Sequence, residues 1–302
     1  MKTPVLPVID FRYVPGLARL FSSNVIRELA TKGFSPFACE MLSEYKLSEK
    51  LNPSMMLRDF YDALFTVLFR TYRNEYVYKN VIADKVLLGT HSLNSSFMLT
   101  EFRAGNCKAD TVVLNGSSCV YEIKSAFDSM NRLERQINAY QKIFDHVNVI
   151  TSEDQLEKVQ RVAGESVGLM VLNKRYAIST VRRSASCKGQ TDPSAIFDSL
   201  RKHEYMEVVE AQFGNAPEVP NTLIYKACKA LFVKLGPEVA HDEMVRVLKK
   251  RGDCCRLKEF VTGVPDSLKA ASLACKLSHR EKSSFLNLLD DGIGNCLLTP
   301  CS

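Results

Sequence analysis

Apolar side chains recur at helical spacing through the first part of the chain. Val25, Ile26 and Leu29 share one face of a segment that runs from residue 24 to residue 30 and stops before Gly33. A second helix is expected to begin near Ser54, a residue type favoured at the N-cap. Its apolar stripe consists of Leu57, Tyr61, Leu64, Phe65 and Leu68. Residues 1–70 are therefore predicted to form an N-terminal helical segment.

The middle of the chain changes to short apolar runs that are typical of β-strands. Such runs cover residues 96–103, 109–114 and 119–124, and the Asn-Gly pair after the second run predicts a hairpin. The series continues with a helix, a strand, a helix and a strand, at residues 132–144, 147–151, 153–163 and 168–172. This order predicts an α/β fold with a mixed central sheet and flanking helices.

Helical periodicity returns in the last third of the chain. Four helical segments are expected, at residues 193–213, 221–235, 237–250 and 266–289. The predicted organisation is an N-terminal helical segment at 1–70, an α/β core at 71–190 and a C-terminal helical region at 191–302.

Composition favours a folded protein outside the membrane. Hydrophobic residues make up 46% of the 302 positions and charged residues 25%, which excludes wholesale disorder. The most apolar segment, residues 63–69, is far shorter than the roughly 20 residues of a membrane-spanning helix. The first residues lack the apolar run of a signal peptide. We therefore expect a cytoplasmic protein without a membrane partner, whose net charge of +6 permits a polyanionic partner but does not require one.

The ten cysteines could form disulfides or bind a metal, so their spacing matters. No Cys-x-x-Cys pair occurs, and none of the five histidines lies at zinc-ligand spacing beside a cysteine. Cys254 and Cys255 are adjacent, which suits neither a bridge nor a chelate. We expect reduced thiols that serve as small apolar side chains.

Several common catalytic motifs are absent. The sequence contains no P-loop, no dinucleotide-binding glycine motif, no HExxH and no GxSxG. What remains is Asp110 on the first strand of the predicted hairpin, and Glu122 and Lys124 on the second. Alternate residues of a strand share a face, so Glu122 and Lys124 project together. Asp110 joins them only if it pairs with residue 122 or 124, which requires a connection of three or five residues, or a bulge.

Two carboxylates and a lysine on one face suit metal-assisted phosphate chemistry. Asp110 and Glu122, with the carbonyl of Ile123, are oxygen ligands of the kind that Mg²⁺ or Mn²⁺ prefers. Lys124 can hold or deprotonate a metal-bound water, or stabilise charge that develops on a phosphate. A solvated strand face with unrelated charges is the alternative interpretation, because a carboxylate and a lysine two positions apart are common.

The predicted helix after the hairpin adds two polar residues. Gln136 and Tyr140 are four positions apart, so they lie on one face beside Leu133 and Ile137. A glutamine next to an apolar stripe needs a polar partner.

This set of residues resembles the PD-(D/E)XK nuclease superfamily, and within it the RecB-like branch with a Gln-x-x-x-Tyr helix. The resemblance covers residues 71–172 and includes the predicted order of strands and helices. The chain is also similar to an uncharacterised bacterial family carrying this domain, in the stretches 75–80 and 121–124. The matching motif residues are Asp110, Glu122, Lys124, Gln136 and Tyr140.

The resemblance implies a restriction-endonuclease-like sheet and a role for each matching residue. Asp110 and Glu122 match the two acids that bind metal, and Lys124 matches the catalytic lysine. Gln136 and Tyr140 match the accessory pair that lines the site and helps to position nucleic acid.

The family often adds an acid from a helix that precedes the sheet. Glu75 is the expected further metal ligand, and Glu101 on the first strand competes with it; a structural role for Glu75 is the alternative. Ala109 stands where the family name has proline, a position that varies within the superfamily. The cysteine spacings do not support the iron–sulfur cluster that some RecB-type members bind.

Other residues could have either a functional role or a purely structural one. His91 lies close to the predicted site in sequence, although a lone histidine more often has a structural role. Two basic clusters could hold phosphates, which would make binding salt-dependent, or could simply be solvated. They consist of Arg182, Arg183 and Lys188, and of Arg246, Lys249, Lys250, Arg251, Arg256 and Lys258.

The sequence thus predicts a bacterial, metal-dependent nuclease that uses Mg²⁺ or Mn²⁺ to hydrolyse phosphodiester bonds, with DNA a better candidate than RNA. A non-catalytic nucleic-acid-binding or scaffold protein that retains the nuclease fold is the main alternative. A third interpretation is a helical interaction protein whose hairpin charges are incidental. Endonuclease or exonuclease action, strand preference, protein partners and oligomeric state stay open.

Overall fold

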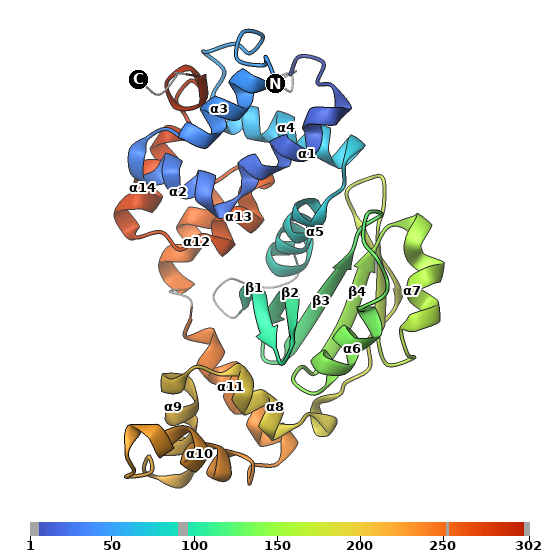
Figure 1. Cartoon of the computed structure of the whole chain (residues 1–302), viewed down its shortest axis with the longest axis vertical. Coiled ribbons are helices and arrows are strands. Elements are labelled where there is room, and N and C mark those ends of the chain that lie inside the picture. Colours follow the sequence, from blue (N-terminus) through green and yellow to red (C-terminus); the bar gives the residue numbers. More distant parts are fainter. Residues whose placement is uncertain (1–5, 90–95, 252–253, 299–302) are drawn as a thin grey trace. The chain divides into compact units, whose positions relative to one another are not determined.

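The computed structural model describes residues 6–89, 96–251 and 254–298, except for the side chains of residues 254–256. The chain divides into two compact units (Figure 1). The first unit combines residues 1–89 with residues 254–302, and the second consists of residues 90–253. The last part of the expected C-terminal region therefore packs with the N-terminal helices, whereas residues 191–249 stay with the sheet.

The first unit is built from helices in the residues described. Its N-terminal part contains α1 (Val14–Leu17), α2 (Ser23–Lys32), α3 (Pro36–Glu44), α4 (Leu57–Thr71) and α5 (Glu75–Val81), followed by a π-helix (Ile82–Leu88). Its C-terminal part contains α12 (Cys254–Gly263), α13 (Lys269–Ala274), α14 (His279–Leu288) and a second π-helix (Gly294–Leu298). Short 3₁₀ turns lie at Phe11–Tyr13, Ala18–Phe21 and Asp266–Leu268. No described helix is both long and apolar enough to cross a lipid bilayer.

Polar contacts join the two ends of the chain within this unit. Asn80 is fully buried, and its side chain donates to the carbonyl of Asp266 at 2.7 Å and accepts from the N–H of Ala270 at 3.0 Å. Arg58 at the start of α4 forms an ion pair of 2.6 Å with Asp290. A buried amide that satisfies backbone groups of a distant segment fixes the packing of that segment, since leaving those groups unpaired is costly.

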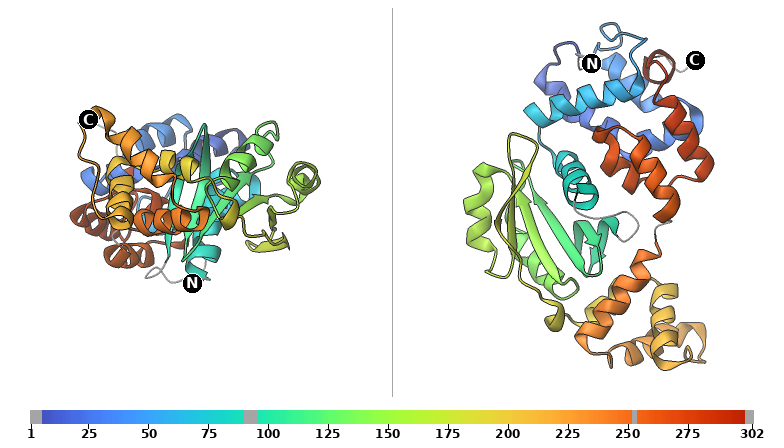
Figure 2. Two further views of the ribbon diagram at one scale, coloured as in Figure 1. Left: turned by 90° about the horizontal axis from the view of Figure 1, so that it is seen from below. Right: turned by 180° about the vertical axis from the view of Figure 1, so that it is seen from behind.

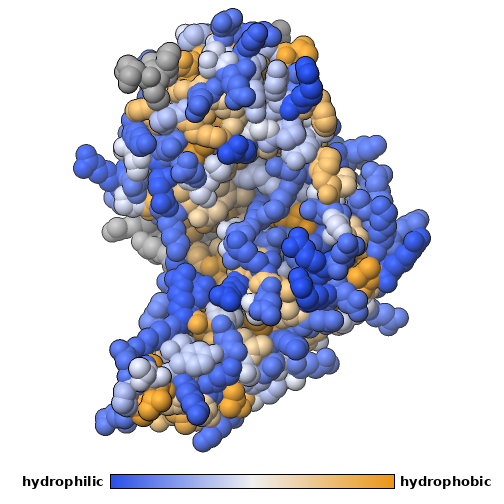
Figure 3. Space-filling model, in the orientation of Figure 1, coloured by the Kyte–Doolittle hydropathy of each residue, from blue (hydrophilic) through white to orange (hydrophobic). Residues whose placement is uncertain are grey.

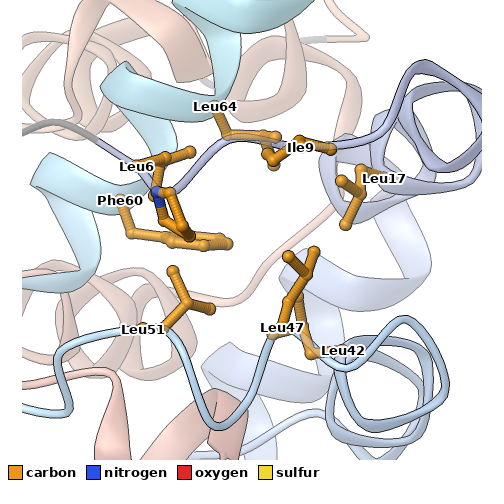
Figure 4. Close-up of a pocket in the computed structure, with 9 residues that line it drawn as sticks. Leu6, Ile9, Leu17, Leu42, Leu47, Leu51, Phe60 and Leu64 are labelled. Carbon is orange, nitrogen blue, oxygen red and sulfur yellow. The ribbon is translucent and has the colours of Figure 1, made fainter.

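A small pocket in the first unit is apolar. Figure 4 shows side chains from α4 and from the N-terminal segment that face a common space. The lining residues are Leu6, Pro7, Ile9, Leu17, Leu42, Leu47, Leu51, Phe60 and Leu64. None of them carries a charge or a side-chain hydrogen-bonding group, so the pocket offers no catalytic chemistry.

The second unit contains a six-stranded mixed sheet in the order β1-β2-β3-β4-β5-β6 (Figures 1 and 2). Strands β1 to β3 form an antiparallel meander, β4 and β5 continue parallel to β3, and β6 returns antiparallel. The strands are β1 (Phe97–Ala104), β2 (Cys107–Leu114), β3 (Ser118–Lys124), β4 (His146–Thr151), β5 (Gly168–Leu172) and β6 (Ile178–Arg182). The predicted α/β class, with a mixed sheet, flanking helices and a C-terminal helical region, is confirmed.

Among the described residues of this unit, six helices of four or more residues accompany the sheet. The helix α6 connects β3 to β4 and packs against β2 and β4, and α7 connects β4 to β5. The remaining four follow β6 and form the helical end of the unit. Their bounds are α6 (Leu133–Gln141), α7 (Leu156–Val162), α8 (Pro193–Ser199), α9 (Lys202–Phe213), α10 (Asn221–Phe232) and α11 (Pro237–Lys249), with 3₁₀ turns at Glu153–Gln155 and Lys188–Gln190.

Buried polar contacts attach these C-terminal helices to the sheet. His241 of α11 lies 2.7 Å from the hydroxyl of Ser118 at the start of β3, and both residues are fully buried. Arg251 donates two hydrogen bonds, of 2.5 and 2.7 Å, to the carboxylate of Glu204. Its guanidinium also lies 5.4 Å from the ring centre of Phe102 on β1.

Two predicted helices are each divided by a new helix start. The segment 193–213 breaks before α9, because the carboxylate of Glu204 accepts the N–H of Arg201 at 2.7 Å. The segment 266–289 breaks before α14, where Ser278 and Glu281 form a capping box.

Two other features differ from the expectations of the sequence. The helix α4 begins at Leu57 with Met56 at the N-cap, whereas the N–H of Ser54 bonds to the side chain of Asn52 in a preceding turn. The apolar pattern does not predict the strand β6, because Ser179, Thr180 and Val181 are exposed and lack the alternation of a half-buried strand.

Candidate active site

The register of the β2–β3 hairpin places Asp110 opposite Glu122. The ladder pairs Leu114 with Ser118 and ends with Thr111 paired to Tyr121, so the next positions are 110 and 122. The connection has three residues, 115–117, which is one of the lengths that brings these carboxylates onto the same face. The hairpin therefore satisfies the geometric condition set by the sequence.

The backbone pairing of β2 with β3 ends at Thr111 and Tyr121, and beyond it the side chain of Asp110 bonds to the backbone of β3. The N–H of Ile123 donates to Oδ2 of Asp110 at 2.7 Å. Because the N–H and C=O of one strand residue point towards the same neighbouring strand, the carbonyl of Ile123 also faces the Asp110 side. Asp110 and the backbone of Ile123 thus lie next to each other, as the expected ligand set requires.

Four side chains form one hydrogen-bonded network beside Asp110. The Nζ of Lys124 lies 2.7 Å from Oε1 of Glu122 and 2.9 Å from Oε1 of Gln136. The Nε2 of Gln136 donates to Oε1 of Glu122 at 2.5 Å. The hydroxyl of Tyr140 lies 2.7 Å from Oε2 of Glu122 and 3.0 Å from the carbonyl of Lys108. The structure therefore brings Gln136 and Tyr140 of α6 onto the acid and the lysine of β3.

Burial makes the contacts of this network strong. Glu122 is 1% exposed and Lys124 is 5% exposed, so their charges are held in a medium where unpaired ions are costly. Burial raises the pKa of Tyr140, and the nearby carboxylates of Glu122 and Asp110 raise it further. The phenol therefore stays protonated and remains a donor to Glu122.

The hydrogen bonds of Glu122 leave one position for a cation. Its Oε1 accepts from Lys124 and from Gln136, which uses both lone pairs of that oxygen. Its Oε2 accepts from Tyr140 and retains one lone pair. Glu122 can thus bind a metal ion through Oε2 alone, while Lys124 and Gln136 hold the other oxygen.

Glu101 lies next to Asp110 across the neighbouring strand pair. The pairs Thr100–Thr111 and Phe102–Ala109 flank the two residues, and their carboxylate oxygens come within 4.8 Å of each other. Glu101 has a φ of +58°, an uncommon conformation for a residue other than glycine. Its carboxylate also forms an ion pair of 2.6 Å with Lys108.

The residues of this face fit a hard divalent cation. Mg²⁺ binds oxygen at about 2.0–2.1 Å, so two oxygens on opposite sides of one ion are about 4 Å apart. The separation of Glu101 and Asp110, at up to 4.8 Å, needs only a small side-chain rotation to reach that value. Carboxylate and carbonyl oxygens are also the donors that Mg²⁺ and Mn²⁺ prefer.

The other acid considered for the metal site belongs to the first unit. Glu75 is the first residue of α5, is exposed, and forms an ion pair of 2.5 Å with Lys79 one turn later. His91, the remaining candidate for a catalytic role, lies outside the described residues.

Ion pairs occupy many of the basic residues that the sequence suggests for phosphate binding. Arg251 binds Glu204, as described above. The others with acidic partners are Lys188 with Asp242, Arg246 with Glu207 and Glu243, and Lys250 with Glu207.

Arg182 binds backbone carbonyl groups. Its guanidinium donates to the carbonyls of Ala163, Gly164 and Val167. Neighbouring Arg183 is exposed, and the side chain of Arg256 lies outside the described part of the chain.

A second polar cluster carries no motif that the sequence reveals. Asp145 accepts hydrogen bonds from the hydroxyls of Ser117 and Ser186, and Ser118 bonds to the N–H of Asp145 and to His241. A serine next to a histidine resembles a nucleophile and its base, but Ser118 is fully buried and its oxygen is already bonded twice. The cluster therefore fastens α11 to the sheet and is closed to substrate.

The cysteines agree with the expectation of reduced thiols. Within the described residues, seven cysteines are present without a disulfide, and six of them are buried. Burial raises the pKa of Cys119 to about 11, so this thiol stays protonated.

Comparison with known proteins gives one family. Residues 69–257 match the family described as Bacteriophage P4 protein cII, a range that includes every residue of the candidate site. Protein cII of Enterobacteria phage P4 is 32% identical over 83 residues, which are 28% of this chain and 31% of that protein. The chain thus matches about a third of the length of this curated relative. The solved structure of the SPO1766 protein of unknown function from Silicibacter pomeroyi has a TM-score of 0.27 and 16% identity, over 39% of this chain and 81% of that one. The family match covers more than half of this chain, so the chain belongs to the Bacteriophage P4 protein cII family.

Proposed function

We propose that this protein is a metal-dependent nuclease of the PD-(D/E)XK type. The observation that carries the proposal is the buried network of Glu122, Lys124, Gln136 and Tyr140 with Asp110 opposite it on the hairpin. A buried carboxylate–lysine pair that is fully hydrogen-bonded, on the same face as a second carboxylate, has the composition of a site for metal-assisted phosphate chemistry.

Asp110, Glu122 through Oε2, and the Ile123 carbonyl would hold the cation, with Glu101 as a further ligand. When bound, Mg²⁺ or Mn²⁺ neutralises phosphate charge and lowers the pKa of an attacking water.

The protein's own groups position the reaction. Two of the three N–H bonds of the Lys124 ammonium point to Glu122 and Gln136, which leaves one for the attacking water or a phosphate oxygen. Its role would be to orient and stabilise these groups. Gln136 and Tyr140 keep Glu122 in one rotamer.

The partner in this proposal is nucleic acid, with DNA a better candidate than RNA, and the setting is the cytoplasm. The unbridged cysteines of the described residues support a reducing compartment.

The experiment is a cleavage assay on circular and linear DNA and on RNA, with Mn²⁺ and with EDTA. The variants Asp110→Asn and Lys124→Met are compared with Asp154→Asn and Lys158→Met, which change the same residue types at exposed positions. We expect the first pair to lose about 100-fold or more of the Mn²⁺-dependent rate, as removal of a key electrostatic group does elsewhere. The second pair should keep the wild-type rate.

Full activity of either site variant would refute the assignment. Salt-sensitive binding without cleavage under any divalent metal would instead support the alternative of a non-catalytic nucleic-acid-binding scaffold.

A further inference from the structure

A groove of about 320 Å³ lies between α2 and α14 of the first unit. These two helices pack against each other (Figure 1), and the groove is formed by the C-terminal half of each. Its volume falls in the range of small-molecule sites. The lining residues are Leu29, Ala30, Thr31, Gly33, Ser284, Asn287, Leu288 and Asp291.

The α14 side of the groove offers hydrogen-bonding groups without partners. Ser284 and Asn287 are three positions apart, so they share one face of the helix, and Asp291 follows in the turn after its end. All three residues are exposed. Among the described residues, neither the Ser284 hydroxyl, the Asn287 amide nor the Asp291 carboxylate has a hydrogen bond or an ion pair. These groups are therefore available to a ligand.

The α2 side adds negative potential from its backbone. The N–H of Gly33 donates to the carbonyl of Leu29 at 3.0 Å and ends the helix. The carbonyls of Ala30 and Thr31, both lining residues, accept no backbone hydrogen bond from the part of the chain that the structure describes. Carbonyls left over at a helix C-terminus carry partial negative charge and favour a cation nearby.

The lining decides which kind of cation fits. Asp291 is the only charged residue that lines the groove, and within the described residues it belongs to no group of three side chains that could hold a metal ion. One carboxylate beside apolar Leu29, Ala30 and Leu288 is a poor site for a hard metal ion, which needs several oxygen ligands. An alkylammonium suits the groove better, because its methylene groups can lie against apolar side chains while its N–H groups need acceptors.

We propose that this groove binds a primary alkylammonium group, with Asp291, Asn287 and Ser284 as its hydrogen-bond acceptors. A free aliphatic diamine and the lysine side chain of a partner protein both present this group. The groove belongs to the first unit, whereas Asp110, Glu122 and Lys124 belong to the second. The inference therefore does not rest on the proposed nuclease function.

The experiment is calorimetric titration of the full chain with three probes. They are the diamine cadaverine, the uncharged analogue pentanediol, and Nα-acetyl-lysine methylamide, which presents a lysine side chain alone. The site variants are Asp291→Asn and Ser284→Leu. Their matched controls are Asp154→Asn and Ser283→Leu, which change the same residue types at exposed positions outside the groove.

We expect the wild type to bind cadaverine at least about tenfold more tightly than pentanediol, since only the diamine carries charge. Asp291→Asn should weaken cadaverine binding by about tenfold, as expected for the loss of one hydrogen bond to a charged group. Ser284→Leu should weaken it by at least as much, because leucine fills the groove. Both controls should keep the wild-type affinity. All four variants should keep the wild-type melting temperature, since each change is at an exposed position.

Equal affinity of Asp291→Asn and the wild type for cadaverine would overturn the proposal. So would equal binding of pentanediol, no binding of either amine, or an equal loss in Asp154→Asn, which would indicate attraction to the overall charge of the protein. Binding of both amines would support the ammonium group as the ligand from either source. Binding of cadaverine alone would support a free diamine, and binding of the lysine derivative alone would support a partner's lysine. None of these results depends on cleavage of nucleic acid.

Discussion

Glu122 is the residue on which the candidate site depends. Its carboxylate is buried, and three side chains, Lys124, Gln136 and Tyr140, bond to it. Strand alternation and the four-residue helical spacing are sufficient to predict from the sequence that these residues lie on shared faces. They do not show which oxygen of Glu122 is occupied, because that depends on how α6 crosses the sheet. No sequence signal marks Lys108, which enters through its backbone carbonyl and its ion pair with Glu101.

Tyr140→Phe tests this network at the level of one hydroxyl. The substitution keeps the ring, which packs edge-on against Phe144, and leaves the buried Oε2 of Glu122 without its donor. We expect the free energy of unfolding to fall by about 1–3 kcal/mol, the cost of an unsatisfied buried group. The measurement is urea denaturation.

Tyr225→Phe is the matched control. This phenol also donates to a carboxylate, that of Asp198, but 47% of Tyr225 is exposed and water can replace the bond. We expect Tyr225→Phe to lower the free energy of unfolding by no more than about 0.5 kcal/mol. Equal costs for the two variants would mean that the network at Glu122 is not held as the structure shows.

At the scale of elements, the strands and helices follow the sequence pattern where one face is buried. The strand β6 escapes prediction because its middle residues are exposed, and α9 escapes because Glu204 caps a new helix in a continuous helical pattern. The attachment of α11 to β3 through His241 and Ser118 joins residues 123 positions apart, a contact that local periodicity cannot reveal.

This attachment predicts a pH dependence of stability. Burial lowers the pKa of His241, and the positive charge of Lys188 acts in the same direction. The carboxylates of Asp242 and Asp145 act in the opposite direction, but the net effect is a lowered pKa. The folded protein therefore prefers the neutral imidazole. Its contribution is complete above the pKa of an unfolded histidine, about 6.5, and is lost as the pH falls below that value.

The measurement is the free energy of unfolding between about pH 8 and about pH 5 for the wild type and for His241→Gln. The stability advantage of the wild type should shrink on acidification. Burial raises the pKa of Asp145, but the hydrogen bonds from Ser117 and Ser186 bring it below its usual value. Protonation of Asp145 therefore reduces the stability of the protein only at lower pH. An advantage that stays constant over this range would contradict the assignment of a neutral, buried His241.

At the scale of the whole molecule, the chain is not divided into consecutive segments. Residues after 254 return to the N-terminal helices, through contacts such as Arg58 with Asp290 and Asn80 with Asp266. Helical patterning predicts that these segments are helices but carries no information about their distant partners. In the view of Figure 3, hydrophilic residues cover most of the visible surface and hydrophobic residues form scattered patches between them.

Many of the basic residues already form ion pairs with acidic side chains, so few are left to bind phosphates. We therefore expect the proposed nucleic acid binding to depend only weakly on salt concentration. Exposed Arg132, Arg135 and Arg183 could neutralise about three phosphates, which gives a log–log slope near −2 for a single strand. Arg135→Gln should reduce that slope by about 0.7. Lys250→Gln removes a cation that Glu207 already pairs at 2.8 Å and should leave the slope unchanged. Loss of affinity in the second variant alone would place the binding surface on α11 instead.

The most direct test of the account is calorimetric titration of Mn²⁺ into the full-length wild type, Asp110→Asn and the exposed control Asp154→Asn. We predict binding by the wild type and the control, and a loss of about tenfold or more in affinity for Asp110→Asn, since one anionic ligand becomes neutral. Binding of equal strength by all three proteins, or by none of them, would show that the carboxylates of the β2–β3 hairpin do not hold a metal ion.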